Sequence, residues 1–225
     1  MVLAGGFGTR LKPLVSSVPK PLAPVHGKPF LFYLLNNWIA QGITNFVFLL
    51  HYEAFQIEEF LRGISKISPF KFTCVHENKP LGTGGAILNA INLLNLNDSF
   101  LVTNADTWLD DGIKQVSEIS PNIITSVKVL NCERYGSIVT KGDKVIKFIE
   151  KSNSLGSGYV SAGLYHLDPG LFKNFSNYDF FSLERDVFPV LIKNRELKSI
   201  KLKAQFIDIG IPEDYLKFCD LIRKK

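Results

Sequence analysis

A short cationic loop near the start of the sequence has the residue types that bind a polyanion. The stretch "GGFGTR" covers residues 5–10, and a proline-flanked lysine, Lys20, follows in "VPKP". Glycine has no Cβ and adopts positive φ, so a ligand can approach the backbone amides of this loop closely. Successive amides together with Arg10 and Lys20 suit phosphate groups. The loop therefore predicts a nucleotide-phosphate site, with a glycine-rich surface turn as the alternative.

Two familiar phosphate-binding motifs do not fit this loop. A Walker A loop requires G-x-x-x-x-G-K-[ST], whereas Lys20 lies twelve residues beyond Gly8. The dinucleotide fingerprint G-x-G-x-x-G leads directly into a helix. Here the spacing is G-G-x-G, and the prolines between residues 13 and 24 oppose an immediate long helix. The sequence therefore predicts a long, ordered, basic loop of another kind.

Two carboxylates stand where apolar strands are expected to end. Asp106 closes "SFLVTNAD", and Asp208 lies in "FIDIG". In an open α/β sheet, ligands bind beyond the carboxyl ends of the strands. Carboxylates there suit Mg²⁺ that faces a triphosphate, and the pair could hold a metal that bridges the reacting phosphates. A turn or helix-cap role is the alternative for each aspartate.

Two further segments carry candidate ligand-binding groups. The stretch "ENKPLGTGGA" (77–86) follows a predicted strand, and its glycines again allow close backbone approach, just before a helix. Lys151 follows Glu150 at the end of "KFIEK" and could meet a second phosphate, although such a pair also suits an ordinary surface. The four histidines have no metal-ligand spacing, and no serine stands in a hydrolytic triad pattern.

The elements that position these residues alternate between strand and helix patterns. The 225-residue chain therefore predicts one α/β domain with a Rossmann-like, mixed but mostly parallel sheet covered by helices. A hairpin is expected across Gly142-Asp143, and Pro189 should kink or split its helix. Helices are expected at 30–41, 53–63, 83–95, 182–194 and 212–225. Strands are expected at 1–3, 45–50, 70–77, 99–106, 122–130, 136–151, 158–168 and 199–210.

Composition narrows the class of protein. Hydrophobic residues make up 46% of the chain and charged residues 21%, which is typical of a globular protein. No apolar run is long enough for a membrane span, no signal peptide is visible, and three scattered cysteines suit a reducing compartment, so we expect a cytoplasmic protein without a membrane partner. The net charge of +5 is spread along the chain, which favours a small anionic substrate over nucleic acid.

With these segments in place, the chain resembles the sugar-1-phosphate nucleotidylyltransferases. It carries "GGFGTRLKP…PKP", "PLGTGGA", "NADT", "IEK", "SAGLY" and "FIDIGIPEDY" in the order of that family, from residue 3 to residue 215. The resemblance implies the nucleotide-diphospho-sugar transferase fold, which is GT-A-like. It also implies a single domain, 1–225, with a nucleotide-binding part, 1–115, and a sugar-phosphate-binding part, 116–225.

The resemblance assigns a role to each motif residue. It implies catalytic roles for Arg10, Lys20, Asp106 and Asp208, with the two aspartates holding Mg²⁺. It implies nucleotide binding by Leu3, Ala4, Gly5, Gly6, Gly8, Thr9, Arg10, Lys20, Leu81, Gly82, Thr83 and Gly85. It implies sugar-phosphate binding by Gly136, Glu150, Lys151 and Gly163. The implied reaction joins a nucleoside triphosphate and a sugar 1-phosphate to give a nucleotide sugar and pyrophosphate.

Within this family, "FSLERDVFP" and "FIDIGIPEDY" look most similar to the D-glycero-α-D-manno-heptose 1-phosphate guanylyltransferases. GTP is then the expected nucleotide, with UTP as its competitor. Mannose, hexosamine and N-acetylmuramic acid 1-phosphates are the alternative acceptors. A catalytically silent regulatory paralogue is the alternative from another class, and the phenylalanine-rich helices could form a homodimer face.

Overall fold

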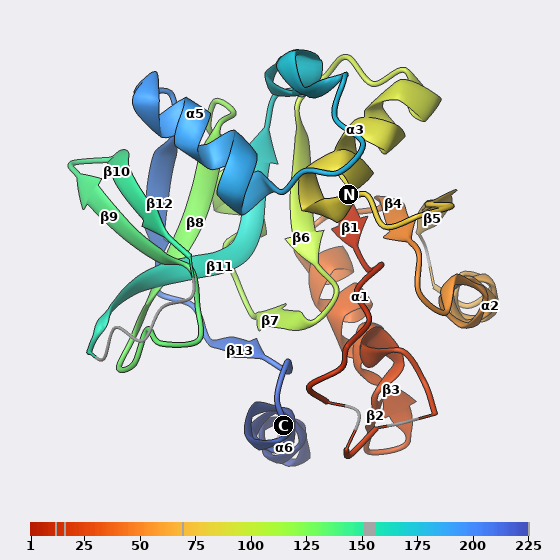
Figure 1. Ribbon diagram of the computed structural model, residues 1–225. Helices are drawn as coiled ribbons and strands as arrows, with labels where there is room; N and C mark the ends of the chain where they lie inside the picture. Colours follow the sequence, from red (N-terminus) through yellow and green to blue (C-terminus); the bar gives the residue numbers. More distant parts are fainter. Residues whose placement is uncertain (12, 16, 69, 151–155, 225) are drawn as a thin grey trace. The chain divides into compact units, whose positions relative to one another are not determined.

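The computed structural model describes residues 1–11, 13–15, 17–68, 70–150 and 156–224 (Figure 1). The chain forms two compact units, each assembled from separate stretches of sequence. The first unit comprises Met1–Lys79, Thr103–Asp110 and Gln205–Lys225, and the second comprises Pro80–Val102 and Asp111–Ala204. These units are defined by which residues pack together and not by function. The functional division into 1–115 and 116–225 therefore stays a prediction.

Parallel strands form the sheet of the first unit. Their order is β5-β4-β1-β6, and β6 continues into the second unit. The strand β1 has only two residues, yet it is central: Val2 pairs with Phe48 of β4 on one side and with Thr103 of β6 on the other. The bounds are β1 (Val2–Leu3), β4 (Asn45–Leu50), β5 (Lys71–His76) and β6 (Phe100–Asn104). The short first strand and its neighbours are confirmed.

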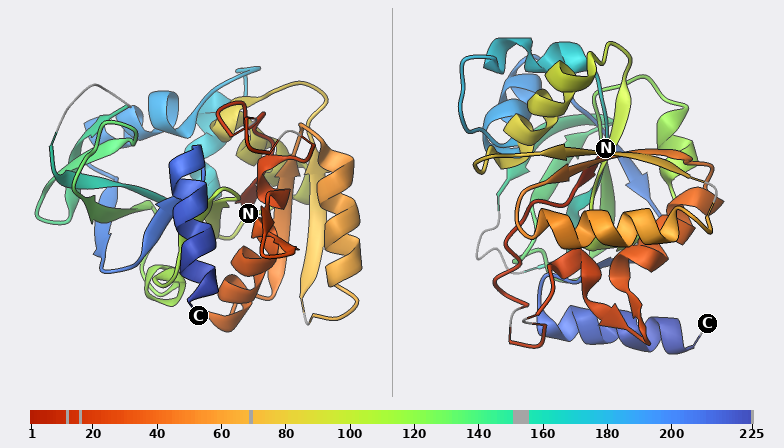
Figure 2. Two further views of the ribbon diagram at one scale, coloured as in Figure 1. Left: turned by 90° about the horizontal axis from the view of Figure 1, so that it is seen from below. Right: turned by 90° about the vertical axis from the view of Figure 1, so that its right-hand side faces the viewer.

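Helices α1 (Phe30–Ala40) and α2 (Ala54–Ile64) cover one face of these strands, with α6 (Pro212–Arg223) beyond α1 (Figure 2). Gly42 lies just past the end of α1 with a φ of 95°, which side chains rarely adopt, so the helix stops there as predicted. The rings of Phe30 and Phe218 meet edge to face, with centroids 4.7 Å apart, and both are fully buried. This contact anchors α6 to α1.

Short elements complete the first unit. The 3-10 turn η1 (Lys20–Leu22) precedes a small hairpin of β2 (Pro24–Val25) and β3 (Lys28–Pro29). A second two-stranded ladder joins β7 (Thr107–Leu109) to β13 (Phe206–Asp208) in antiparallel register. The sequence patterns did not predict β2, β3 or β7, because two- and three-residue strands carry almost no periodic signal.

The single strand expected at 199–210 is wrong. The chain forms β12 (Lys198–Leu202) in the second unit and β13 in the first, and residues 203–205 lie between them outside either strand. The side chain of Asp110 accepts a hydrogen bond from the Gln205 amide at 2.7 Å, and the Asp110 amide donates to the Gln205 carbonyl at 3.2 Å. These bonds direct the chain into the β7–β13 ladder.

The second unit has a mixed sheet with the order β6-β11-β8-β12-β10-β9, and β9 also pairs with β11. The additional pairing therefore closes a ring of five strands, β11, β8, β12, β10 and β9. The β8–β12 ladder is parallel, whereas β12–β10, β10–β9, β11–β8 and β11–β9 are antiparallel, so "mostly parallel" describes the strands of the first unit. A two-residue hairpin forces antiparallel neighbours. The bounds are β8 (Ile123–Val129), β9 (Ser137–Lys141), β10 (Lys144–Ile149) and β11 (Gly158–Leu167).

The predicted hairpin turn and the predicted helix break are both confirmed in the second unit. Gly142, with a φ of 64°, and Asp143 join β9 to β10. The 182–194 pattern divides into a π-helical turn, η3 (Leu183–Val187), and α5 (Phe188–Lys193), with Pro189 in the first turn of α5. The other helices are α3 (Gly82–Leu94), α4 (Ile113–Ser117) and the 3-10 helix η2 (Pro169–Phe175). Among the described residues, none of the helices combines the length and apolarity needed to cross a membrane.

Candidate active site

Within the first unit, the opening loop begins at a fixed point, the end of β1. The Leu3 carbonyl accepts a hydrogen bond from the Ala105 amide at 3.0 Å, and the Ala4 amide donates to the Leu49 carbonyl at 3.0 Å. Beyond them the loop opens: Gly6 is exposed, and a Cβ added there would meet nothing within 4 Å. A ligand can therefore approach the backbone at Gly6, whereas a Cβ at Gly5 would lie 3.2 Å from His51. The ligand-binding roles of Gly5, Gly6, Gly8, Thr9 and Arg10 stay predictions.

Lys20 returns to this loop and meets one of the predicted aspartates. Gly8 has a φ of +60°, and a Cβ there would lie 3.2 Å from the Lys20 Cβ, so glycine makes room for the lysine stem. The Lys20 Nζ lies 2.6 Å from Asp106 Oδ2, with the lysine side chain 11% exposed and the aspartate 32% exposed. A short, half-buried ion pair thus joins residues 86 positions apart.

The β7–β13 ladder places the second aspartate beside the first. Asp208 pairs with Thr107, and the Ile209 amide donates to the Asp106 carbonyl at 2.9 Å. Asp208 Oδ1 accepts a hydrogen bond from the Gly210 amide at 2.7 Å, which holds that carboxylate against the backbone. The two aspartates are therefore neighbours along one ladder.

Arg10 reaches the same end of that ladder. A Cβ added at Gly210 would lie 3.4 Å from Arg10 Nη2 and 2.7 Å from Asp208 Oδ1, so the glycine leaves room for both groups. The first unit therefore brings together residues that the sequence predicted separately, namely Gly8, Arg10, Lys20, Asp106 and Asp208. Two cations and two carboxylates beside open backbone can bind phosphate and a hard cation.

The second glycine loop is built differently. Gly82 has a φ of +76°, and a Cβ there would lie 2.4 Å from the Phe181 carbonyl oxygen. The amides of Gly84 and Gly85 donate to that same oxygen at 3.1 and 3.2 Å, and the Leu81 carbonyl accepts from the Phe181 amide at 3.1 Å. The Phe181 backbone therefore fixes this loop on both sides of Gly82, and the nucleotide-binding roles of Leu81, Gly82, Thr83 and Gly85 stay predictions. Of the predicted nucleotide-binding residues here, Gly85 has its amide engaged by the protein.

Two of the residues predicted to hold the sugar phosphate, Gly136 and Gly163, are tied to β11 by hydrogen bonds. The Ser161 amide donates to the Gly136 carbonyl at 2.8 Å, and the Gly163 amide donates to Ser161 Oγ at 3.4 Å. Gly163 has a φ of +70°, which only glycine adopts readily. Glu150 is exposed directly after β10 ends, where Ile149 pairs with Ser137. The prediction for Lys151 lies outside the described residues.

The sequence patterns did not identify the partner of the second glycine loop. Thr83 Oγ1 donates to Glu184 Oε2 at 2.8 Å, across 101 positions of sequence. Serine is a favoured residue at a helix N-cap, and Ser182 occupies that position before η3, with its Oγ accepting from the amides of Glu184 and Arg185 at 3.1 and 3.3 Å. That cap signal marked the segment as ordered, but it carried no information on which loop the segment would contact.

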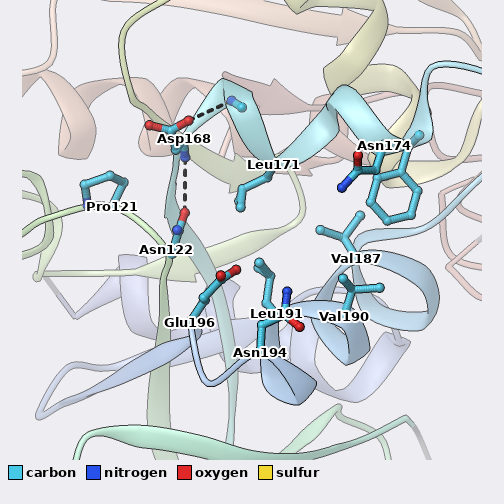
Figure 3. A pocket seen from close by; sticks show the side chains of 12 residues that line it. Pro121, Asn122, Asp168, Leu171, Asn174, Val187, Val190, Leu191, Asn194 and Glu196 are labelled. Carbon is cyan, nitrogen blue, oxygen red and sulfur yellow. Dashed lines mark hydrogen bonds between the residues drawn. The ribbon is translucent and has the colours of Figure 1, made fainter.

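A pocket of about 310 Å³ lies in the second unit (Figure 3). Asn122 and Asp168 line one end of it, and Asn174 and Val187 line the other. Asp168 Oδ1 accepts from the Gly170 amide at 2.7 Å, so the carboxylate caps η2. No residue that the sequence assigned to chemistry lines this pocket, as far as the described chain extends.

Comparison with known proteins identifies relatives over the whole chain. The family described as nucleotidyl transferase matches residues 1–225. The D-glycero-alpha-D-manno-heptose 1-phosphate guanylyltransferase of Campylobacter jejuni is 33% identical over 225 residues, which cover 97% of this chain and 97% of that protein. The mannose-1-phosphate guanylyltransferase catalytic subunit beta of Drosophila pseudoobscura pseudoobscura is 32% identical over 96% of this chain. The chain spans only 60% of that longer protein.

Solved structures are also similar to this chain over nearly its whole length. HddC from Yersinia pseudotuberculosis superposes with a TM-score of 0.84 and 36% identity, covering 98% of this chain and 97% of HddC. The complex of HddC with GMP-PN gives a TM-score of 0.81 and 35% identity over the same shares. The inositol-1-phosphate CTP transferase from T. maritima, at 17% identity and a TM-score of 0.81 over 99% of this chain and 94% of that chain, shares the fold. The predicted mixed α/β fold is confirmed.

Proposed function

Because the chain belongs to the nucleotidyl transferase family, we propose that it transfers the guanylyl group of GTP to D-glycero-α-D-manno-heptose 1-phosphate. The coarser activity, nucleotidyl transfer to a sugar phosphate, follows from the family and its guanylyltransferase relatives. The observation that carries the finer proposal is the 33% identity to the heptose enzyme over 97% of both chains. The GMP-PN complex of HddC supports a guanine nucleotide.

The proposed reaction forms one phosphorus–oxygen bond and breaks another. An oxygen of the sugar phosphate attacks the α-phosphorus of GTP in line. The bond from that phosphorus to the α–β bridging oxygen breaks, and pyrophosphate leaves with the electron pair. The substrate supplies the nucleophile, so the protein contributes positioning and stabilisation of charge.

The described residues of the opening loop suit the triphosphate side of this reaction. Arg10 is exposed and planar, so it can bind two phosphate oxygens at once. An ammonium group has three donors, so the Lys20 Nζ can keep its contact with Asp106 and still donate to phosphate. The open backbone at Gly6 lets phosphate oxygens reach the amides. In the same proposal, Gly136, Glu150, Lys151 and Gly163 hold the sugar phosphate.

Mg²⁺ fits the donor set that Asp106 and Asp208 provide. Mg²⁺ is bound in nucleotide enzymes by one or two carboxylates plus phosphate oxygens and water, and the backbones of these two aspartates are neighbours at the β7–β13 ladder. When bound, the ion would neutralise charge on the phosphates. Asp106 Oδ1 already accepts from the Thr107 hydroxyl at 3.2 Å, which helps to fix the direction of that carboxylate.

The direct test is pyrophosphate release from four nucleoside triphosphates crossed with heptose, mannose, glucose and glucosamine 1-phosphates. Each pair is assayed with Mg²⁺ and with EDTA. The expected result is Mg²⁺-dependent release with GTP and the heptose phosphate at a kcat/KM at least about tenfold above every other pair.

Other outcomes discriminate among the alternatives. Preference for mannose, a hexosamine or N-acetylmuramic acid 1-phosphate, the last added as a fifth acceptor, would keep the family activity and reject the heptose substrate. Pyrophosphate release in the presence of EDTA would reject the proposed role of Mg²⁺ in the reaction. If no pair released pyrophosphate but calorimetry showed nucleotide binding, the result would instead support a regulatory paralogue.

A further inference from the structure

The segment 180–186 wraps the start of α3, where the second glycine loop lies. The Phe181 backbone holds this loop from both sides, because its amide donates to Leu81 and its carbonyl accepts from Gly84 and Gly85. The Phe181 ring stacks on Phe175, with centroids 5.0 Å apart and planes at 14°, and it is 1% exposed. The segment is therefore anchored in the core of the second unit at the point where it contacts the loop.

A single carboxylate oxygen completes this attachment. Glu184 Oε2 accepts hydrogen bonds from Thr83 Oγ1 at 2.8 Å and from Ser182 Oγ at 2.6 Å. Thr83 Oγ1 accepts in turn from the Leu183 amide at 2.9 Å. The Thr83 hydroxyl thus uses its donor and one acceptor position on the 180–186 segment, and both bonds to the carboxylate have the short lengths typical of charge-assisted hydrogen bonds.

We propose that Glu184 is a positioning residue that acts through Thr83 on the backbone of residues 81–83. This inference rests on the proposed function, with the nucleotide bound at Leu81, Gly82 and Thr83 as the resemblance to the family implies. Gly82 has a φ of +76°, and its carbonyl and amide directions follow from that conformation. The Thr83–Glu184 bond adds a fixed point directly after Gly82. The loop is therefore held in one shape before a ligand arrives, which lowers the entropy cost of binding.

Steady-state kinetics on matched variants separates positioning from a general loss of stability. Thr83→Val removes the hydroxyl and keeps the branched shape, whereas Thr83→Ser keeps the hydroxyl. Glu184→Ala removes the acceptor, whereas Glu184→Gln keeps one oxygen for both hydroxyls. We expect Thr83→Val and Glu184→Ala to raise the KM for the nucleotide about tenfold, with the KM for the sugar phosphate changed less than about twofold.

The conservative variants and an external control complete the kinetic series. Thr83→Ser and Glu184→Gln should recover the nucleotide KM to within about threefold of wild type. Arg185→Ala, at an exposed side chain on the same turn, should leave both KM values unchanged. Equal rises in both KM values, or a nucleotide KM that stays at the wild-type value in Thr83→Val and Glu184→Ala, would overturn the proposal.

Amide hydrogen exchange of residues 81–85 tests the same contact without substrate. We expect this segment to exchange about tenfold faster in Thr83→Val than in Thr83→Ser, with residues 123–129 unchanged in both. Equal exchange in the two variants would overturn the positioning role even if the enzyme were active. If the wild type neither released pyrophosphate nor bound any nucleotide, the proposed function would fail. The exchange result would then still decide whether Thr83 and Glu184 hold the loop.

Discussion

The two glycine-rich loops share a composition but are held by different forces. The opening loop leaves Gly6 in open space and is tied by the Lys20–Asp106 ion pair. In the second loop, a Cβ at Gly84 would lie 2.4 Å from the Phe181 ring, and backbone hydrogen bonds fix Gly84 and Gly85. The comparison indicates that glycine leaves the backbone open at position 6 of the first loop, whereas it permits close packing against Phe181 in the second.

The largest effect is expected from breaking the ion pair of the opening loop. Lys20→Ala removes the cation that we propose binds phosphate, and Asp106→Asn removes a carboxylate that we propose holds the metal, so each should lower kcat/KM by about 10²–10³. The melting temperature of each variant should stay within a few degrees of that of the wild type, because the Lys20–Asp106 ion pair is not fully buried. Pyrophosphate release and a melting curve measure the two quantities.

Lys66→Ala, at an exposed lysine elsewhere in the first unit, is the control for that pair of variants. It should change neither activity nor stability. A Lys20→Ala enzyme with wild-type kcat/KM would show that the opening loop does not bind the triphosphate through this side chain.

A matched pair of glycine variants tests the comparison itself. Gly84→Ala gains helix propensity of about 1 kcal/mol but forces the methyl group into the Phe181 ring, so we expect a net loss of about 1–2 kcal/mol in the free energy of unfolding. Gly6→Ala adds a methyl group in open space and should change stability by less than about 0.5 kcal/mol. Urea denaturation gives both values.

For enzyme activity, in contrast to stability, we expect the larger loss in Gly6→Ala and the smaller loss in Gly84→Ala. Gly6→Ala should lower kcat/KM about tenfold, because its methyl group would lie where phosphate oxygens approach the backbone. A Gly6→Ala protein with full activity would refute close approach at this position. A Gly84→Ala protein as stable as wild type would instead refute tight packing in the second loop.

The smallest effect concerns stability at high pH, and it arises away from both loops. Burial raises the pKa of the Cys74 thiol from 9.0 to about 11, with the charge of Glu58 adding to the shift. The unfolded chain loses this proton near pH 9 while the folded chain keeps it, so stability falls as the pH rises from about 9 to 11. Cys74→Ser should flatten this part of the profile, as urea titrations at pH 8, 9, 10 and 11 would show. An unchanged slope would contradict the shift.

Local chemistry in the sequence was enough to predict the main elements and the residues of the opening loop. Apolar periodicity gave the long strands and helices, Gly142-Asp143 gave the hairpin, and Pro189 gave the break before α5, because each signal depends only on neighbours along the chain. The glycines, Arg10 and Lys20 indicated phosphate binding from their residue types alone. The segment 199–210 was predicted wrongly, because its strand pattern contains no information on which strand it pairs with.

Tertiary structure alone decided which distant groups meet. Lys20 and Asp106 are 86 positions apart, and Thr83 and Glu184 are 101 apart. Strand register, which depends on pairing across the ladder, placed Asp208 opposite Thr107. Hydrogen bonds and ion pairs act over a few ångströms in space, so their partners follow from the packed fold and not from local sequence preference. The sequence by itself therefore determined the candidate reactive groups, and packing determined their partners.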